Sequence, residues 1–124
     1  GTDASNLKND YGLVRVWDYA SGNFTKTDLQ FCGLLMGDHS QCAIQTTFNT
    51  ATVVGIGCNL FGHGFPRQFI PSFLRGGAQG FSENRLEKVL ETVKAMKKRR
   101  SIDFTSTDKN RLKDIFKKTA KFRN

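Results

Sequence analysis

The sequence predicts a mainly β chain that ends in two α-helices. Its first part is expected to form a short parallel β-helix of hexapeptide repeats, and its second part a basic helical extension. Three observations support this prediction: a β-prone hairpin near the N-terminus, a six-residue period in the middle, and a helical apolar period in the C-terminal third. Because 124 residues suit one domain, we expect residues 1–81 and 82–124 to be two parts of a single structural domain.

The first predicted element is a β-hairpin inserted in the β region. Residues 14–17 are short, β-prone and alternating, and residues 24–27 form a second extended run. Residues 19–23 between them read Tyr-Ala-Ser-Gly-Asn, which is typical of a turn.

A six-residue repeat follows the hairpin. Every sixth residue is apolar, and a small residue lies four positions after each apolar one. The apolar set is Met36, Cys42, Phe48, Val54 and Leu60, and the small set is Ser40, Thr46, Thr52, Cys58 and Gly64. In a parallel β-helix of triangular section, about six residues carry the chain from one face to the next. The large residues would then fill the interior, and the small ones would fit where it narrows.

The segment after the repeat is rich in phenylalanine, glycine and proline. Residues 65–81 contain Phe65, Phe69, Phe73 and Phe81, with two prolines among them. We predict a capping loop without regular helix or strand, which covers the end of the β-helix and docks the helices. A loop that lines a ligand site is the alternative.

Two helices are predicted in the C-terminal part. Residues 82–100 carry an apolar stripe at helical spacing, made of Leu86, Val89, Leu90, Val93 and Met96, with Ser82 placed to cap its start. A second helix would begin after Thr105 or Thr107, because Thr105 and Asp108 have the spacing of a capping box.

The positive charge lies entirely in this helical part. Residues 1–81 hold five cations and five acids, whereas residues 82–124 account for the whole formal net charge of +8. We interpret most of these cations as a solvated outer face, and the run Lys97, Lys98, Arg99 and Arg100 as the candidate phosphate contact. Nucleic-acid binding is not favoured, since no recognised motif is present and the charged runs lack interleaved aromatic residues.

Composition also argues against a membrane protein, a secreted protein and a metalloprotein. No apolar stretch is long enough to span a membrane, and residues 1–6 do not resemble a signal peptide. Cys32, Cys42 and Cys58 are an odd number without a C-x-x-C pair, which indicates a reducing cytoplasm and no disulfide framework. With only His39 and His63 as histidines, no metal site is predicted.

Several short segments resemble a known family. They are Ser5–Asn9, Gly37–His39, Phe48–Thr50, Gly64–Pro66 and Phe69–Phe73, together with the repeat from Met36 to Gly62. The repeat resembles the left-handed β-helix of hexapeptide-repeat transferases. The whole chain is similar to the C-terminal part of sugar-1-phosphate nucleotidyltransferase and acetyltransferase proteins, which are relatives of the bifunctional N-acetylglucosamine-1-phosphate uridylyltransferase.

The resemblance implies a set of candidate site residues. Asn6 aligns with an asparagine that the family places at the sugar site, and Arg15 falls near the position of a lysine that binds the sugar phosphate there. If the family's cofactor acetyl-CoA binds, the candidate contacts for its phosphates are Lys97, Lys98, Arg99 and Arg100 of the basic helices. The catalytic histidine of the family is not present in this chain, so the resemblance leaves its status as an enzyme open. His39 is the substitute candidate for a general base, against the interpretation that it occupies a corner of the repeat.

Two functions are therefore expected as alternatives. The first is the C-terminal β-helix domain of a sugar-nucleotide transferase-like, acyltransferase-related protein that binds a sugar phosphate or acetyl-CoA. The second is a non-catalytic trimerisation or scaffold module that partners a nucleotidyltransferase domain. The resemblance implies a homotrimer in both cases.

Overall fold

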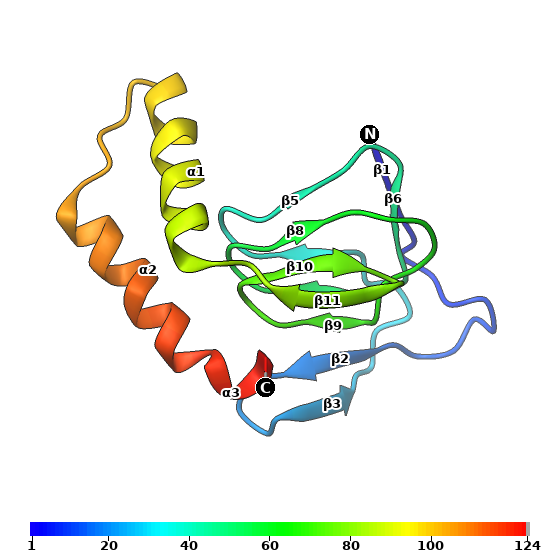
Figure 1. Ribbon diagram of the computed structural model, residues 1–124. Coiled ribbons are helices and arrows are strands. Elements are labelled where there is room, and N and C mark those ends of the chain that lie inside the picture. The colour runs from blue at the N-terminus through cyan, green and yellow to red at the C-terminus, as the bar shows by residue number, and fades with distance from the viewer. Residues whose placement is uncertain (124) are drawn as a thin grey trace.

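The computed structural model describes residues 1–123 as a small mixed α/β fold. Two long helices pack against one side of a group of short strands, and the C-terminal helix returns to the N-terminal hairpin (Figure 1). The strands are β1 (Thr2–Ala4), β2 (Arg15–Asp18), β3 (Asn23–Lys26), β4 (Leu35–Met36), β5 (Gln41–Cys42), β6 (Thr46–Phe48), β7 (Val53–Val54), β8 (Asn59–Leu60), β9 (Phe69–Ile70), β10 (Leu74–Gly77) and β11 (Gly80–Glu83). The helices are α1 (Leu86–Arg99), α2 (Ser106–Lys118) and α3 (Ala120–Arg123).

The strands of the described part, residues 1–123, form four small sheets. Their orders are β1-β6, β2-β3, β4-β7-β9 and β11-β10-β8-β5. The β2-β3 and β10-β11 pairs are antiparallel, and the other pairs are parallel. The predicted hairpin is confirmed, because β2 and β3 pair from Arg15↔Lys26 to Asp18↔Asn23.

The predicted β-helix is wrong. Residues 1–123 form no closed or solenoid β-helix, but separate sheets of two to four strands with mixed directions. The step between parallel strands also changes: Leu35 pairs with Val53, eighteen residues later, whereas Val53 pairs with Phe69, only sixteen residues later. Strands of two or three residues, an inserted hairpin and an antiparallel edge strand interrupt the continuous faces that a solenoid needs.

The six-residue period nevertheless has a local structural cause. Residues with positive φ recur at His39, Gln45, Ala51 and Gly57, where φ lies between 57° and 69°. These residues occupy left-handed turns between successive short strands. The φ of His39 therefore belongs to a repeated turn geometry and is not in itself a functional signal.

The main hydrophobic core lies inside the strand region, residues 1–81. Its buried residues are Phe48, Val54, Cys58, Leu60, Ile70 and Leu74. Three of the repeat's apolar positions, Phe48, Val54 and Leu60, are at most 2% exposed, as the period predicts. Met36 is 38% exposed because it lies in β4, at the edge of its sheet.

The prediction of a loop without regular helix or strand at residues 65–81 is wrong, although Phe73 of this segment packs against Val89 and Val93 of the first long helix. The segment contains β9 and β10 and the start of β11. Gly76 permits this tight hairpin: its φ is +130°, and a Cβ there would lie 2.1 Å from the carbonyl oxygen of Gly80. Glycine content in this segment therefore marks close strand approach and not irregular structure.

The two long helices form where the apolar period predicts them, but the first begins later than expected. Helix α1 begins at Leu86, because Ser82 pairs with Arg75 in the β10-β11 hairpin and does not cap the helix. The stripe packs as predicted, with Val89 and Val93 buried. The capping box of α2 is confirmed, with reciprocal hydrogen bonds of 3.1 Å between Thr105 and Asp108.

None of the helices in residues 1–123 combines the length and the apolar character that crossing a lipid bilayer requires.

Candidate functional site

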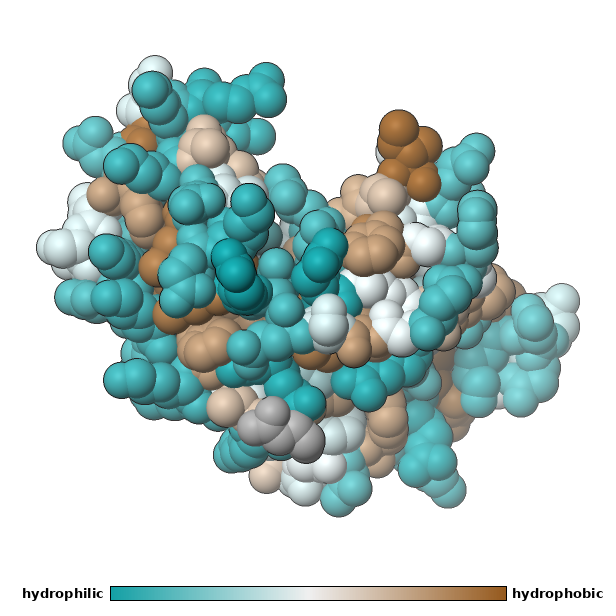
Figure 2. All heavy atoms as spheres, in the orientation of Figure 1, coloured by the Kyte–Doolittle hydropathy of each residue, from teal (hydrophilic) through white to brown (hydrophobic). Residues whose placement is uncertain are grey.

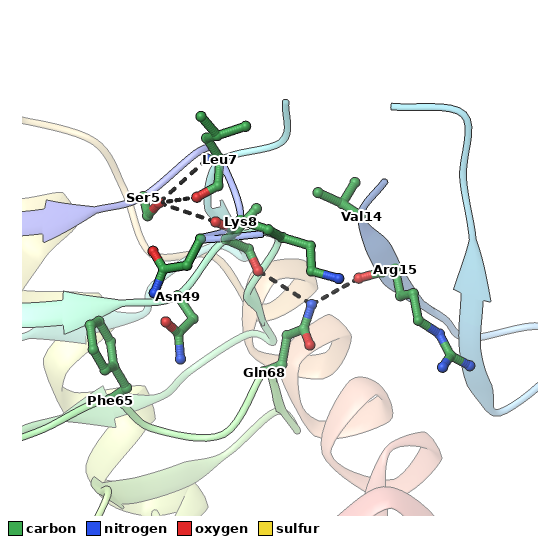
Figure 3. Close-up of a pocket in the computed structure, with 10 residues that line it drawn as sticks. Ser5, Leu7, Lys8, Val14, Arg15, Asn49, Phe65 and Gln68 are labelled. Carbon is green, nitrogen blue, oxygen red and sulfur yellow. Dashed lines mark hydrogen bonds between the residues drawn. The ribbon is translucent and has the colours of Figure 1, made fainter. Parts of the chain in front are cut away.

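The candidate site is a cavity of about 370 Å³ between the N-terminal segment, the start of β2 and the end of β6. It is lined by Ser5, Leu7, Lys8, Asn9, Val14, Arg15, Asn49, Thr50, Phe65 and Gln68. Polar side chains converge on it from segments that are far apart in the sequence (Figure 3). Such a mixture of an apolar wall and a few converging polar groups is typical of small-molecule sites.

Hydrogen bonds fix one wall of this cavity. Gln68 Nε2 donates to the backbone carbonyl of Arg15 at 2.8 Å and lies 3.3 Å from that of Thr50. On the opposite wall the Ser5 hydroxyl donates to the carbonyl of Leu7 at 2.9 Å, and the Thr50 hydroxyl donates to Ser5 Oγ at 3.1 Å. These bonds hold β2, the N-terminal segment and the turn after β6 in one arrangement, so the cavity is preformed.

Lys8 supplies the cation best placed for a ligand. Figure 3 shows its side chain running across the cavity toward Gln68, whereas the Arg15 guanidinium extends away from Asn49 and Phe65. The only carboxylate that pairs with Lys8 within residues 1–123 is Asp10, at 4.0 Å, and both side chains are well exposed. An exposed pair at this distance contributes little, so the ammonium group of Lys8 is free to bind an anion.

The two predicted sugar-phosphate residues fall on and beside this cavity. Arg15 lines it, at the first position of β2. Asn6 is exposed and does not line it, although its neighbours Ser5 and Leu7 do. The backbone carbonyl of Asn6 accepts a hydrogen bond from Cys32 N at 2.9 Å, which fixes the segment against the loop before β4.

A second cavity, of about 280 Å³, brings together two other candidates. His39 and Lys97 both line it, with Asp38, Asp108 and Arg111 as further charged residues. Its floor is apolar and is formed by Ile56, Val93, Leu112 and Ile115. The charged side chains comprise two carboxylates and two cations, so the cavity has no strong preference for an anion.

Lys97 is held by a structural ion pair. Its Nζ lies 2.8 Å from Asp108 Oδ2 and joins the end of α1 to the start of α2. This hydrogen bond, with the backbone N–H of Thr105 as a second donor, lowers the pKa of Asp108 from 3.8 to about 2. Lys97 therefore does not act as an unengaged phosphate contact.

The rest of the predicted basic cluster forms no cavity with Lys97. Lys98, Arg99 and Arg100 are exposed, and none of them lines the His39 cavity. They lie at the C-terminal end of α1, where cations interact favourably with the helix dipole. Their placement fits the solvated outer face better than a coenzyme site.

The two cavities lie on different sides of the molecule. The first adjoins β1, β6 and the start of β2, whereas the second lies where α1 and α2 meet the strands (Figure 1). An acyl transfer needs the acceptor and the general base within hydrogen-bond reach of each other. In a single chain, His39 does not lie beside the cavity that Arg15 lines.

Sequence reasoning missed the residues that dominate the first cavity. The sequence pattern does not point to Lys8, Asn49 or Gln68 individually, although Lys8 and Asn49 lie within segments that carry the family resemblance. Phe65 and Gln68 lie in the segment 65–81, for which a ligand-lining loop is the alternative prediction. Asn49 directly follows the apolar repeat position Phe48, so its place at a turn could be expected from the period. Nothing in the sequence joins Gln68 to Arg15, because their contact depends on chain packing.

In residues 1–123, no three His, Cys, Asp or Glu side chains lie together as metal ligands would.

Comparison with known proteins does not assign the chain to a family. The sequence matches no family model, and it matches neither a curated protein nor a solved structure at a significant level.

Proposed function

We propose that this chain binds a phosphorylated sugar in the cavity lined by Lys8, Asn49 and Phe65, as part of a sugar-nucleotide transferase-like, acyltransferase-related protein. The observation that carries the proposal is the convergence of an ammonium group, amides, hydroxyls and one aromatic ring on a single preformed cavity. Its volume of about 370 Å³ is within the usual range for small ligands.

Each part of a sugar phosphate has a matching group in the cavity. The phosphate would take charge-assisted hydrogen bonds from Lys8, whose pair with Asp10 is exposed and long, at 4.0 Å. The amides of Asn9 and Asn49 can both donate to and accept from sugar hydroxyls. The Phe65 ring, which is 56% exposed, offers dispersion contacts to the apolar face of a sugar ring.

Binding, and not acyl transfer, is the function that this geometry supports best. The candidate base His39 faces the other cavity, and residues that could move a proton at a bound sugar are not among those lining the first cavity within residues 1–123. Lys8 and the amides can hold a substrate through hydrogen bonds to its phosphate and hydroxyl groups.

Calorimetric titration tests the proposal. Glucosamine 1-phosphate is expected to bind saturably with one site per chain, and more tightly than either glucosamine or inorganic phosphate alone. Lys8→Ala and Asn49→Ala should each weaken binding about five- to tenfold, as expected for the loss of one hydrogen bond to a charged or polar ligand group. Lys88→Ala is the matched control, since Lys88 is an exposed cation on α1.

Two results would contradict this function. One is an absence of saturable binding at millimolar sugar phosphate. The other is equal weakening in Lys8→Ala and Lys88→Ala, because a long-range effect of net charge would explain it without a site.

Assembly is a second candidate function, favoured by exposed apolar residues on the strand region. Tyr11, Leu13, Leu29, Phe31, Leu35 and Ile44 are between 52% and 85% exposed. Figure 2 shows hydrophobic residues at the surface close to the N-terminus of the chain, while the helices present a mainly hydrophilic face. Interfaces between chains bury apolar side chains, and a homotrimer or a nucleotidyltransferase domain would cover these residues.

Analytical ultracentrifugation of the chain tests the homotrimer. We expect a trimer, which Leu35→Asp and Ile44→Asp should convert to monomers by burying charge in the interface. Ile102→Asp is the control, because Ile102 is 52% exposed but lies between α1 and α2. A monomeric parent chain would exclude self-assembly and leave the partner domain as the occupant.

We also propose the cytoplasm as the compartment. The three cysteines are free thiols within residues 1–123, and Cys58 is buried in the core. Proteins that keep several unpaired cysteines are typical of reducing compartments. Alkylation of the protein directly on cell lysis should label Cys32 and Cys42 as thiols, and an intermolecular disulfide at either would argue against this location.

A further inference from the structure

We propose a second ligand site, for a nucleoside phosphate, in the cavity between the β2-β3 hairpin, β9 and α3. This cavity measures about 540 Å³ and is lined by Trp17, Gly22, Phe24, Arg67, Gln68, Phe69, Pro71, Lys121 and Phe122. It lies between the β2-β3 hairpin and the C-terminal helix, since β2 lies beside α3 (Figure 1). The inference does not depend on sugar-phosphate binding, because the cations differ.

Aromatic side chains form the walls of this cavity. The Trp17 and Phe69 rings are stacked, with centroids 4.0 Å apart and an interplanar angle of 6°. The rings of Phe24 and Phe122 meet the indole edge-on, at 5.3 and 6.3 Å. Such walls favour a flat aromatic group, because aromatic rings stack on one another or meet edge to face.

Two cations complete the site. Arg67 and Lys121 both line the cavity, and no acidic residue does. Neither forms an ion pair within residues 1–123, where each cation lies beside an aromatic ring instead: Arg67 5.4 Å from the centroid of Phe81 and Lys121 5.1 Å from that of Phe122. Both charges therefore remain available to an anionic group of a ligand.

Trp17, which lines the cavity, also carries an unpaired hydrogen-bond donor within residues 1–123. The Trp17 Nε1–H is buried and has no acceptor within residues 1–123, which is uncommon for a buried polar group. The His39 cavity lacks this combination, since its cations are balanced by carboxylates. A ligand that joins a flat heteroaromatic ring to a phosphate matches the aromatic walls and the two cations together.

The single tryptophan provides a direct readout. Trp17 is the only tryptophan in the chain and lines this cavity, so a ligand bound there should change its fluorescence. AMP is the probe, with excitation at the red edge of indole absorption, where adenine does not absorb. Saturable quenching by AMP is expected, at concentrations at least about tenfold lower than for adenosine or inorganic phosphate, because each of these offers only part of the recognised chemistry.

Variants separate the two parts of the site. Arg67→Gln and Lys121→Gln should each weaken AMP binding about five- to tenfold, since each loses one charge-assisted contact. Lys117→Gln is the matched control on α2, where the side chain is exposed and lies outside the cavity. Phe24→Leu keeps an apolar side chain but removes a ring, and should reduce AMP binding to the level of inorganic phosphate.

Three outcomes would overturn the proposal. They are no saturable quenching at millimolar AMP, equal affinity for AMP and phosphate, and no difference between the cavity variants and Lys117→Gln. If Phe24→Leu fails to fold, the two exposed cation variants still decide the matter. Sugar-phosphate binding should survive in Arg67→Gln and Lys121→Gln, so failure of one site does not imply failure of the other.

Discussion

The strand region and the helical region differ in how they are held together. In the strand region, successive strands each contribute to one core: Phe48 from β6, Val54 from β7, Leu60 from β8 and Ile70 from β9. In the helical region, Val89, Val93 and Leu112 are buried against Phe73, which belongs to the strand region. The helices therefore have no core of their own and depend on the strands for burial.

Charge shows the same division. The strand region is electrically balanced, whereas the helices carry the whole net charge of +8. The cations of the helices repel one another, and this repulsion does not stabilise the helical region. Specific contacts are therefore needed to hold the helices in place. Arg123 and the Lys97–Asp108 pair supply such contacts, so the two regions should respond differently to mutation.

The largest expected effect is in the strand core. Phe48→Ala should reduce the free energy of unfolding by about 3–5 kcal/mol, because it removes a large buried ring and leaves a cavity. Urea unfolding followed by both Trp17 fluorescence and helical circular dichroism should show both signals shifting together. Phe65→Ala is the control, since its ring is 56% exposed and a surface change of this kind usually costs under about 0.5 kcal/mol. Helices that outlast the strands in urea would break the proposed dependence.

An intermediate effect is expected at Arg123. Its side chain is 3% exposed and lies 3.2 Å from Glu83 Oε2, and its guanidinium donates to the carbonyls of Ser72 and Phe116 at 3.2 and 2.9 Å. Arg123→Ala should cost about 2–3 kcal/mol, because it removes the guanidinium hydrogen bonds to both carbonyls and the ion pair with Glu83. Hydrogen exchange should become faster in α2 and stay unchanged in β7 and β8.

The matched control for this variant is Arg99→Ala, at the exposed end of α1. Similar exchange in the two variants would mean that the contacts of Arg123 do not dock the helices.

The smallest expected effect is a change in melting temperature at acidic pH. The pKa of Asp108 is about 2 in the folded chain, below its ordinary 3.8, so its stabilising contribution is present above about pH 4 and is lost as the pH falls toward 2. The melting temperature of the parent chain should exceed that of Asp108→Asn near pH 6, and the difference should shrink between pH 4 and pH 2. Asp114→Asn is the control, because Asp114 makes only an exposed pair with Lys118 at 2.9 Å. A difference that is independent of pH would show that ionisation of Asp108 does not stabilise the fold.

Local signals in the sequence predicted local structure well. The alternation around Val16, the spacing of Thr105 and Asp108, and the apolar stripe through Val89 and Val93 each depend on neighbouring residues, and each appears as expected. The repeat also placed Phe48, Val54 and Leu60 in the core. Ser82 shows the limit: it has the composition of a helix cap, but pairing with Arg75 across the β10-β11 hairpin takes precedence.

The candidate site could be predicted only in part. Arg15 was placed near it by resemblance, and Lys8 and Asn49 lie in segments that carried the same resemblance. The Gln68 bond to Arg15 spans more than fifty residues, and no period or motif reports such a contact. The same is true of Phe122, which reaches Trp17 from the opposite end of the chain.

The sequence by itself determined the charge division, the hairpin, both long helices and the burial of Phe48, Val54 and Leu60 in the strand core. These properties follow from periodicity and capping, which act over a few residues. Only the tertiary structure decided that the strands form separate sheets instead of a continuous β-helix, and which polar groups share a cavity. The physical reason is that strand pairing and cavity walls depend on contacts between distant segments, whose free energies are decided by the packing of the whole chain.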